Sequence, residues 1–379
     1  MASAEIGAGH VYALGFHADY RCRSTGACCS SGWEIPVAPP AEARLRAALA
    51  SGALRVDAPG VPLFRSRREL PDGARVVFGL DAHGRCAFLE PGTRLCAVHR
   101  QVGVAALPPS CRQFPRIALL TPVGTFLTLS HYCPTAAGQL FREDDVPSIA
   151  ADPSAFPACE PWEGLDARQA WPPLLKPGVL LGWDGYVLWQ EQAVGLLLRG
   201  GQTPEAAVAA LRLRANRACE WTASKGTLLG WLERIPDQAQ PTGVLDFDAA
   251  AATWRGVAAR VPDSLRFAAP PLGPGDEPAL AWAEAHVRLV TPQWERFAWP
   301  VRRYLAAKLF ASWAAMQADG LTAWSRAVET ALAVLHVEAT RQCIDTSTPL
   351  DAERLGQAFR RADLLLLHLA RRAAEEVTA

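Results

Sequence analysis

From about residue 179 onward, apolar residues recur every three to four positions, the spacing of one face of a helix. Threonine at position 203 followed by Pro204 marks a helix start, because threonine caps free backbone N–H groups and proline fits the first helical turn. The pattern predicts helices over 183–199, 203–219, 224–235, 280–290, 293–320, 321–341 and 350–377. Proline-rich and glycine-rich breaks are expected at 236–243 and 262–278.

The first 145 residues have a different pattern, with short apolar runs between glycines, prolines and cysteines. Residues 75–80 and 117–129 are predicted as strands, the second folded into a hairpin at its Pro-Val-Gly turn. A helix is predicted over 39–51, with Pro40 in its first turn. Prolines crowd residues 146–178, which predicts a linker.

These elements predict an α+β fold that is mostly α. A small, irregular, cysteine-rich metal-binding domain is expected at 1–145, a proline-rich linker at 146–178 and an α-helical bundle at 179–379. The first domain is short of long helices, so we expect it to need a metal for its stability.

The composition limits the possible binding partners and cellular location of the protein. Lys plus Arg and Asp plus Glu both total 38, and a net charge of zero argues against broad nucleic-acid binding or an acidic membrane surface. No uninterrupted apolar run is long enough for a membrane span, and the first residues have no apolar core of a signal peptide. We therefore expect a cytoplasmic protein, in which thiols stay reduced and serve as ligands or buried apolar groups.

The cysteines are unevenly distributed. Seven of the ten lie between positions 22 and 133, whereas an even spread would place about three or four in the first third of the chain: Cys22, Cys28, Cys29, Cys86, Cys96, Cys111 and Cys133. This clustering indicates a specialised site, and seven thiols are more than the four that one zinc ion or one [4Fe–4S] cluster needs.

The local context of these cysteines favours a metal centre. Small residues and Gly26 surround the adjacent pair Cys28-Cys29, so backbone N–H groups can approach sulfur. Cys86 and Cys96 flank a predicted turn at Pro91-Gly92, which should bring their sulfur atoms together.

The spacing excludes two common motifs. It is neither that of a zinc ribbon nor the C-x₃-C-x₂-C run of ordinary radical S-adenosylmethionine enzymes. An iron–sulfur centre, most simply [4Fe–4S], is the favoured interpretation. A structural zinc site and a set of unrelated buried cysteines are the alternatives.

Four segments carry a family resemblance. The first has Phe16, Cys22 and Cys28-Cys29-Ser-Ser-Gly-Trp33, and the second has Cys86-Ala-Phe-Leu and Leu95-Cys96-Ala-Val-His99. The third has Leu107 and Ser110-Cys111-Arg-Gln-Phe-Pro-Arg116, and the fourth has Leu129-Ser130 and Cys133-Pro-Thr-Ala-Ala137. In this order, within residues 16–140, they resemble the bacterial flagellin lysine-N-methylases and, more distantly, the YkgJ-type zinc/iron-chelating cysteine-cluster proteins. The resemblance implies an iron–sulfur protein that methylates amines with S-adenosylmethionine, and gives the cluster role to the seven cysteines as a set. The implied partner is an amine substrate: flagellin, another protein, a peptide or a small molecule.

Methyl transfer to an amine needs a neutral nucleophile in a water-poor pocket. His99, His131 and Tyr132 lie near cysteines and are candidate catalytic groups, although each is also a common hydrogen-bonding or packing residue. Trp33 is a candidate wall for a methylsulfonium, with core packing as the alternative.

Two arginines, Arg112 and Arg116, are candidates for binding a donor carboxylate or the cluster charge, with structural ion pairing as the alternative. No Gly-x-Gly-x-x-Gly loop follows a strand, so the donor site is expected to be unconventional. An iron without a cysteine ligand could chelate the amino and carboxylate groups of the donor. Radical or redox chemistry on the same scaffold, a non-catalytic zinc/iron-chelating module and a structural zinc domain beside a partner-binding bundle are the competing functions.

Overall fold

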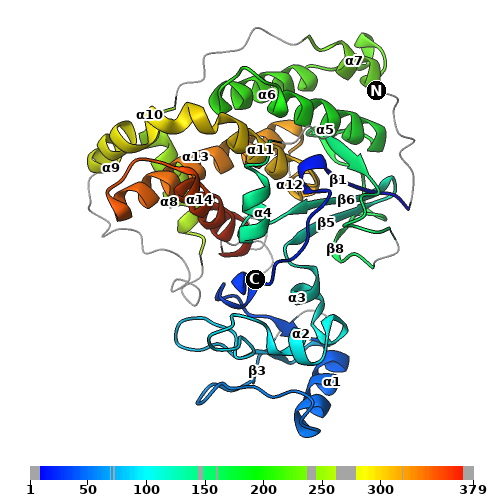
Figure 1. Ribbon diagram of the computed structural model, residues 1–379. Helices are drawn as coiled ribbons and strands as arrows, with labels where there is room; N and C mark the ends of the chain where they lie inside the picture. The colour runs from blue at the N-terminus through cyan, green and yellow to red at the C-terminus, as the bar shows by residue number, and fades with distance from the viewer. Residues whose placement is uncertain are drawn as a thin grey trace.

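The computed structural model describes residues 9–68, 70, 73–143, 148–158, 161–236, 245–261, 279–317 and 319–369. It is a mixed α+β protein dominated by helix, as expected (Figure 1). The breaks expected at 236–243 and 262–278, and the last part of the helix expected over 350–377, lie almost entirely outside the described residues.

A five-stranded sheet forms one layer of the molecule. Its strand order is β7 (Ile149–Ala151), β1 (Val11–Leu14), β6 (Gly124–Leu129), β5 (Arg116–Thr121) and β8 (Gly164–Asp166). Strands β5 and β6 are antiparallel, with Leu119 opposite Phe126, so the hairpin predicted over 117–129 is confirmed. Strand β1 pairs with β6 in parallel.

The segment expected as a linker instead supplies both edges of this sheet. Strands β7 and β8 come from it, and β9 (Leu174–Lys176) and β10 (Val179–Leu180) form a separate two-stranded sheet around its end. The prolines lie beside these strands and not in them, for example Pro153 after β7 and Pro173 before β9. Edge strands this short tolerate neighbouring proline because few of their N–H groups enter the ladder.

Side chains alternate between the two faces of the sheet. Tyr12 and Leu14 of β1 join the large core shared with the helices, whereas Val11 and Ala13 join a smaller core with Phe156 on the opposite face. This period of two is what a strand buried on both sides requires.

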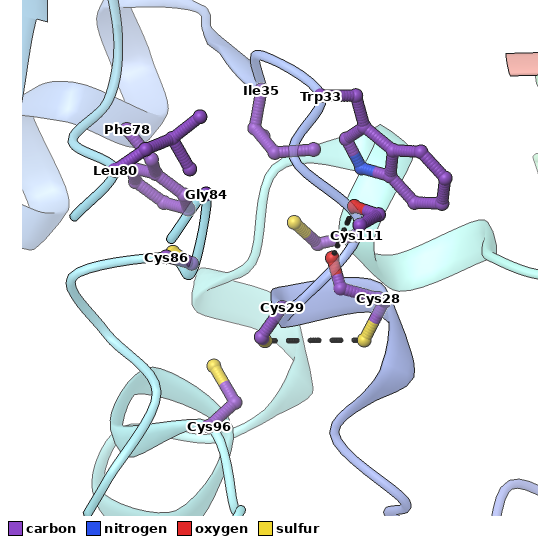
Figure 2. Close-up of a pocket in the computed structure, with 11 residues that line it drawn as sticks. Cys28, Cys29, Trp33, Ile35, Phe78, Leu80, Gly84, Cys86, Cys96 and Cys111 are labelled. Carbon is purple, nitrogen blue, oxygen red and sulfur yellow. Dashed lines mark hydrogen bonds between the residues drawn. The ribbon is translucent and has the colours of Figure 1, made fainter. Parts of the chain in front are cut away.

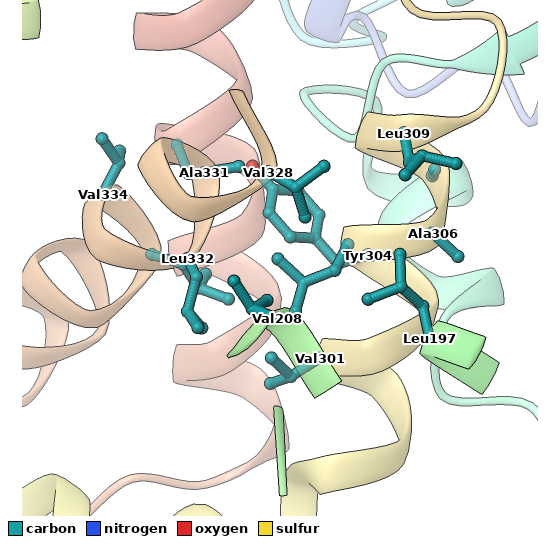
Figure 3. Close-up of a cluster of buried hydrophobic side chains, with 14 of the residues drawn as sticks. Leu197, Val208, Val301, Tyr304, Ala306, Leu309, Val328, Ala331, Leu332 and Val334 are labelled. Carbon is teal, nitrogen blue, oxygen red and sulfur yellow. The ribbon is translucent and has the colours of Figure 1, made fainter. Parts of the chain in front are cut away.

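The helices cover the first of these faces (Figure 1). They are α4 (Pro134–Gln139), α5 (Trp183–Leu198), α6 (Pro204–Cys219), α7 (Leu228–Arg234), α8 (Phe247–Ala258), α9 (Ala279–Ala285), α10 (Thr291–Trp294), α11 (Ala298–Leu309), α12 (Ala314–Gln317), α13 (Leu321–Thr346) and α14 (Ala352–Asp363). Two π-helical segments follow α9 and α14, at His286–Val290 and Leu364–Leu369. Helix α13 is central, and its Val328 packs with Tyr304 of α11 and Val208 of α6 (Figure 3).

Most predicted helices are present, with one correction. The Thr203 hydroxyl accepts a hydrogen bond from the Ala206 N–H, which confirms the predicted cap of α6. The single helix expected over 293–320 is divided into α10, α11 and α12. A 3₁₀ turn, Glu295–Phe297, separates α10 from α11, and the chain is extended at Phe310 and left-handed at Ala311, between α11 and α12. The buried Gln190 side chain accepts the Ala311 N–H at 2.9 Å and stabilises this break.

Residues 26–113 lie between β1 and β5 and form what we call the inserted lobe, below the sheet in Figure 1. It contains α1 (Pro39–Ala50), α2 (Ala97–Gln101), α3 (Pro109–Gln113) and a sheet of β2 (Pro36–Val37), β4 (Val76–Phe78) and β3 (Phe64–Ser66). The helix predicted at 39–51 and the strand predicted at 75–80 are confirmed. The lobe has a hydrophobic core of its own, which includes Val37, Leu45 and Val98.

Candidate metal centre

Five cysteine side chains of the inserted lobe face one apolar pocket (Figure 2). They are Cys28, Cys29, Cys86, Cys96 and Cys111, and the pocket is closed by apolar neighbours that include Trp33, Ile35 and Phe78. Cys28 and Cys29 lie in a 3₁₀ turn, Cys96 precedes α2 and Cys111 lies in α3. Thiols from four separate segments of the chain therefore meet in one place.

A glycine allows the first two of these segments to approach. Gly26, with φ of +73°, precedes the 3₁₀ turn, and a Cβ built on it would lie 2.6 Å from the backbone oxygen of Arg94. No other residue fits there without displacing the loop between Cys86 and Cys96. The Cys86 N–H also donates to the Cys29 carbonyl at 2.7 Å.

The turn predicted between Cys86 and Cys96 is confirmed. The Glu90 N–H donates to the Leu95 carbonyl at 2.9 Å, Gly92 has a φ of +80°, and Leu89 pairs with Cys96 as an antiparallel bridge. Cys29 and, after it, the backbone N–H groups of His99 and Val98 at the start of α2 lower the pKa of the Cys96 thiol. Backbone N–H groups aimed at sulfur stabilise a thiolate or a sulfide-bearing centre.

The sulfur atoms interact strongly with one another. The Cys28 and Cys29 sulfurs are 3.9 Å apart, and the Cys86 and Cys96 thiols also act on Cys29. Cys28, Cys86 and Cys96 raise the pKa of the Cys29 thiol. In the opposite direction, Cys29 lowers the pKa of Cys28, and it lowers the pKa of Cys96 to about 7. Burial raises the pKa of Cys111. Metal binding to all of them would release protons from the thiols with raised pKa values.

The other two candidate ligands lie outside this pocket. Cys22 is exposed and its sulfur accepts the Ser24 N–H at 3.3 Å. Cys133 is buried with its sulfur 3.4 Å from the Tyr20 hydroxyl. Among the described residues, no three or more Cys, His, Asp or Glu side chains are already arranged as ligands of a single metal ion.

Trp33 connects the cysteine pocket with the helical part. Its ring lines the pocket and lies 4.4 Å, between centroids, from the ring of His368 in the C-terminal π-helical segment. Phe114 and Tyr132 pack against the same two rings at centroid distances of 5.4 to 6.3 Å. The rings fill the space between them, so Trp33 is both a wall of the pocket and a packing residue.

The remaining sequence candidates are dispersed. The Tyr132 hydroxyl donates to the Ser30 carbonyl at 3.2 Å, and burial raises its pKa. His99 has an exposed side chain and reaches the pocket only through its backbone N–H. Arg112 lies 3.9 Å from Glu163, and Arg116 lies over the Tyr20 ring, so neither guanidinium lines the cysteine pocket.

His131 belongs to a different buried site. Its backbone N–H and its Nδ1, at 3.2 Å, both contact Oδ2 of Asp363, which is fully buried at the end of α14. Lys308 and Tyr304 of α11 donate to the same carboxylate at 2.7 and 2.9 Å. The Lys308 ammonium holds the pKa of Asp363 well below its usual range. Four buried polar groups thus converge on one carboxylate.

Sequence reasoning did not find Asp363, Lys308, Tyr304, His17 or His368. The sequence does mark two of these residues as unusual. Lys308 is one of three lysines in the chain, and Asp363 immediately precedes a run of four leucines. A charge in a strongly apolar segment is normally paired when it is buried.

Acid is expected to destabilise the protein through its buried histidines. Burial lowers the pKa of His286 to about 3 and that of His368 to about 4, below the ordinary value of about 6.5. The unfolded chain binds their protons first, so the free energy of unfolding should fall by about 1 kcal/mol per pH unit and per histidine as pH drops below ~6.5. Urea unfolding at pH 7, 6 and 5 measures this loss. His368→Phe should reduce the slope, and a stability independent of pH would contradict the prediction.

No protein-family model, curated protein or solved structure matches the chain. None of the helices in the described ranges has the length and apolar character to cross a membrane.

Proposed function

We propose that the inserted lobe is a cysteine-rich metal-binding domain that holds an iron–sulfur cluster. The observation that carries this is the convergence of five thiols from four segments on one apolar pocket. Soft sulfur ligands select iron–sulfur clusters, zinc or copper(I).

The five cysteines of the pocket are one more than a four-thiolate metal centre needs. Adjacent residues cannot easily direct both sulfurs to one iron, so one member of the pair Cys28-Cys29 is the natural extra thiol. The N–H groups of Val98 and His99 would stabilise the sulfur of Cys96 as a ligand. Cys22 and Cys133 are outside the proposed ligand set.

A zinc site is the second candidate, and one distance favours it. The 3.9 Å between the Cys28 and Cys29 sulfurs is close to the edge of a zinc–thiolate tetrahedron, about 3.8 Å for a Zn–S bond of about 2.3 Å. We place iron–sulfur first because the resemblance to flagellin lysine-N-methylases runs through four cysteine segments, three of which reach the pocket.

We propose further that the protein is an N-methyltransferase, acting in the cytoplasm, that moves a methyl group from S-adenosylmethionine to a lysine or another amine. A bound cluster would supply a Lewis acid for the donor if one of its irons were left without a cysteine ligand. The protein itself would supply an apolar surface that excludes water from the methyl donor. Trp33 lines the pocket, and the π-face of its ring can stabilise a methylsulfonium. Excluding water strengthens such electrostatic contacts.

Metal analysis tests the centre directly. Protein purified without oxygen should contain about four irons and four sulfides per chain and show a broad absorption band that bleaches on reduction. One zinc per chain without iron would overturn the iron–sulfur proposal in favour of the zinc site.

The reaction has a separate test. Methyl transfer from isotopically labelled S-adenosylmethionine to flagellin, to lysine peptides and to small amines should depend on the cluster. Formation of 5′-deoxyadenosine on reduction, without methylation, would instead favour radical chemistry. Metal exchange without donor binding would favour a chelating module.

A further inference from the structure

The structure contains two buried hydrogen-bonded chains of side chains, each made of one carboxylate and two histidines. We call the first chain closed because each of its ring nitrogens has a hydrogen-bond partner. Glu205 Oε1 lies 2.9 Å from His336 Nε2, and His336 Nδ1 lies 3.2 Å from His286 Nε2. The last nitrogen, His286 Nδ1, lies 3.2 Å from the Thr291 hydroxyl. Every ring nitrogen of this chain has a partner, as expected of a chain that only stabilises the fold.

The second chain is open. Asp363 Oδ2 lies 3.2 Å from His131 Nδ1, and His131 Nε2 lies 3.2 Å from His17 Nε2. The last nitrogen, His17 Nδ1, has no hydrogen-bond partner among the described residues, although His17 is 0% exposed. An orphaned buried nitrogen is costly, so it indicates a partner that the protein chain does not provide.

The carboxylate fixes the direction of this chain. An ionised Asp363 only accepts, so His131 Nδ1 carries a proton and donates to it. A neutral His131 then accepts at Nε2, which requires His17 to donate from its own Nε2. His17 Nδ1 is consequently a bare lone pair, a hydrogen-bond acceptor at the open end of the chain.

The surroundings keep this acceptor neutral. Burial lowers the pKa of His17 most, followed by His131 and by the cations Lys308 and Arg303 of α11, while Asp363 of α14 opposes them. The same two cations would disfavour a positively charged ligand and favour a neutral amine over its ammonium form.

We propose that His17 Nδ1 binds the attacking amine of the methyl acceptor, with His131 and Asp363 as positioning residues behind it. This inference rests on the proposed methyltransferase function. The nitrogen lone pair forms the N–C bond, the electrons of the C–S bond return to sulfur, and the new ammonium gives its proton to His17 Nδ1.

The closed chain offers a matched control. In His17→Gln, kcat for methyl transfer is expected to fall about 100-fold, the usual contribution of a positioned general base, with iron content and donor binding unchanged. His286→Gln removes the corresponding histidine of the closed chain and should leave kcat within about twofold of wild type. The pH profile of kcat should lose its acid limb only in His17→Gln.

Imidazole ¹⁵N spectra supply a readout that does not depend on turnover. They should show the proton on Nδ1 of His131 and on Nε2 of His17. A protonated His17 Nδ1, or equal kcat in His17→Gln and His286→Gln, would overturn the inference while the methyltransferase proposal stands. A wild-type protein that methylates no amine would overturn both.

Discussion

Cys29→Ala is expected to reduce bound iron from about four atoms per chain to below one. Cys29 hydrogen-bonds Cys28, and Cys28, Cys86 and Cys96 together raise its pKa, so it lies at the centre of the thiol set. Its loss leaves its neighbours without the thiol that organises them. The free energy of metal binding contributes to folding, so the unfolding temperature of the inserted lobe should fall as well. Iron and sulfide analysis, the visible spectrum and a thermal melt measure both effects.

Two other cysteines provide matched alanine controls. Cys343→Ala removes a buried thiol from α13, far from the cysteine pocket in sequence and outside its lining. Cys133→Ala removes a candidate ligand whose sulfur contacts Tyr20. Both variants should retain iron. Full iron in Cys29→Ala together with loss of iron in Cys133→Ala would show that the proposed ligand set is wrong.

The periodic elements were predictable from sequence because each is defined by local spacing. Thr203 and the Pro122-Val123-Gly124 turn act within a few residues, and the structure has a helix start and a hairpin at these positions. Strands β7 and β8 were missed because each is only three residues long and lies at a sheet edge beside prolines. Their pairing partners, β1 and β5, are distant in sequence, so no local pattern marks them.

The candidate site also has features that local sequence predicts and features that depend on the fold. The convergence of Cys86 and Cys96 followed from a turn between them, and the structure confirms it. The separate position of Cys133 depends on how α4 packs beside Tyr20, which spacing does not reveal. The site around Asp363 joins residues that are 55 to 232 positions apart, so only the fold brings them together.

Lys308→Met is expected to lower the free energy of unfolding by about 3–5 kcal/mol, because it leaves the Asp363 charge buried without its cation. The Lys308 side chain is 7% exposed and that of Asp363 is 0% exposed, so water cannot replace the lost ammonium. Methionine preserves most of the apolar stem, so packing loss is small. Urea unfolding at pH 7 measures the change. Lys225→Met removes a lysine from an exposed 3₁₀ turn and is the matched control, with an effect below about 1 kcal/mol.

A double variant separates the ion pair from other causes. In Lys308→Met with Asp363→Asn, no buried charge is left unpaired, so part of the lost stability should return. The folded-state pKa of Asp363 is depressed, which means that its stabilising contribution is present above an unfolded pKa of about 4 and is lost as pH falls below it. The difference in stability between wild type and the double variant should therefore shrink at about pH 3. If Lys308→Met and Lys225→Met cost the same, the buried pair does not stabilise the fold, and the anchor of the open histidine chain would be in question too.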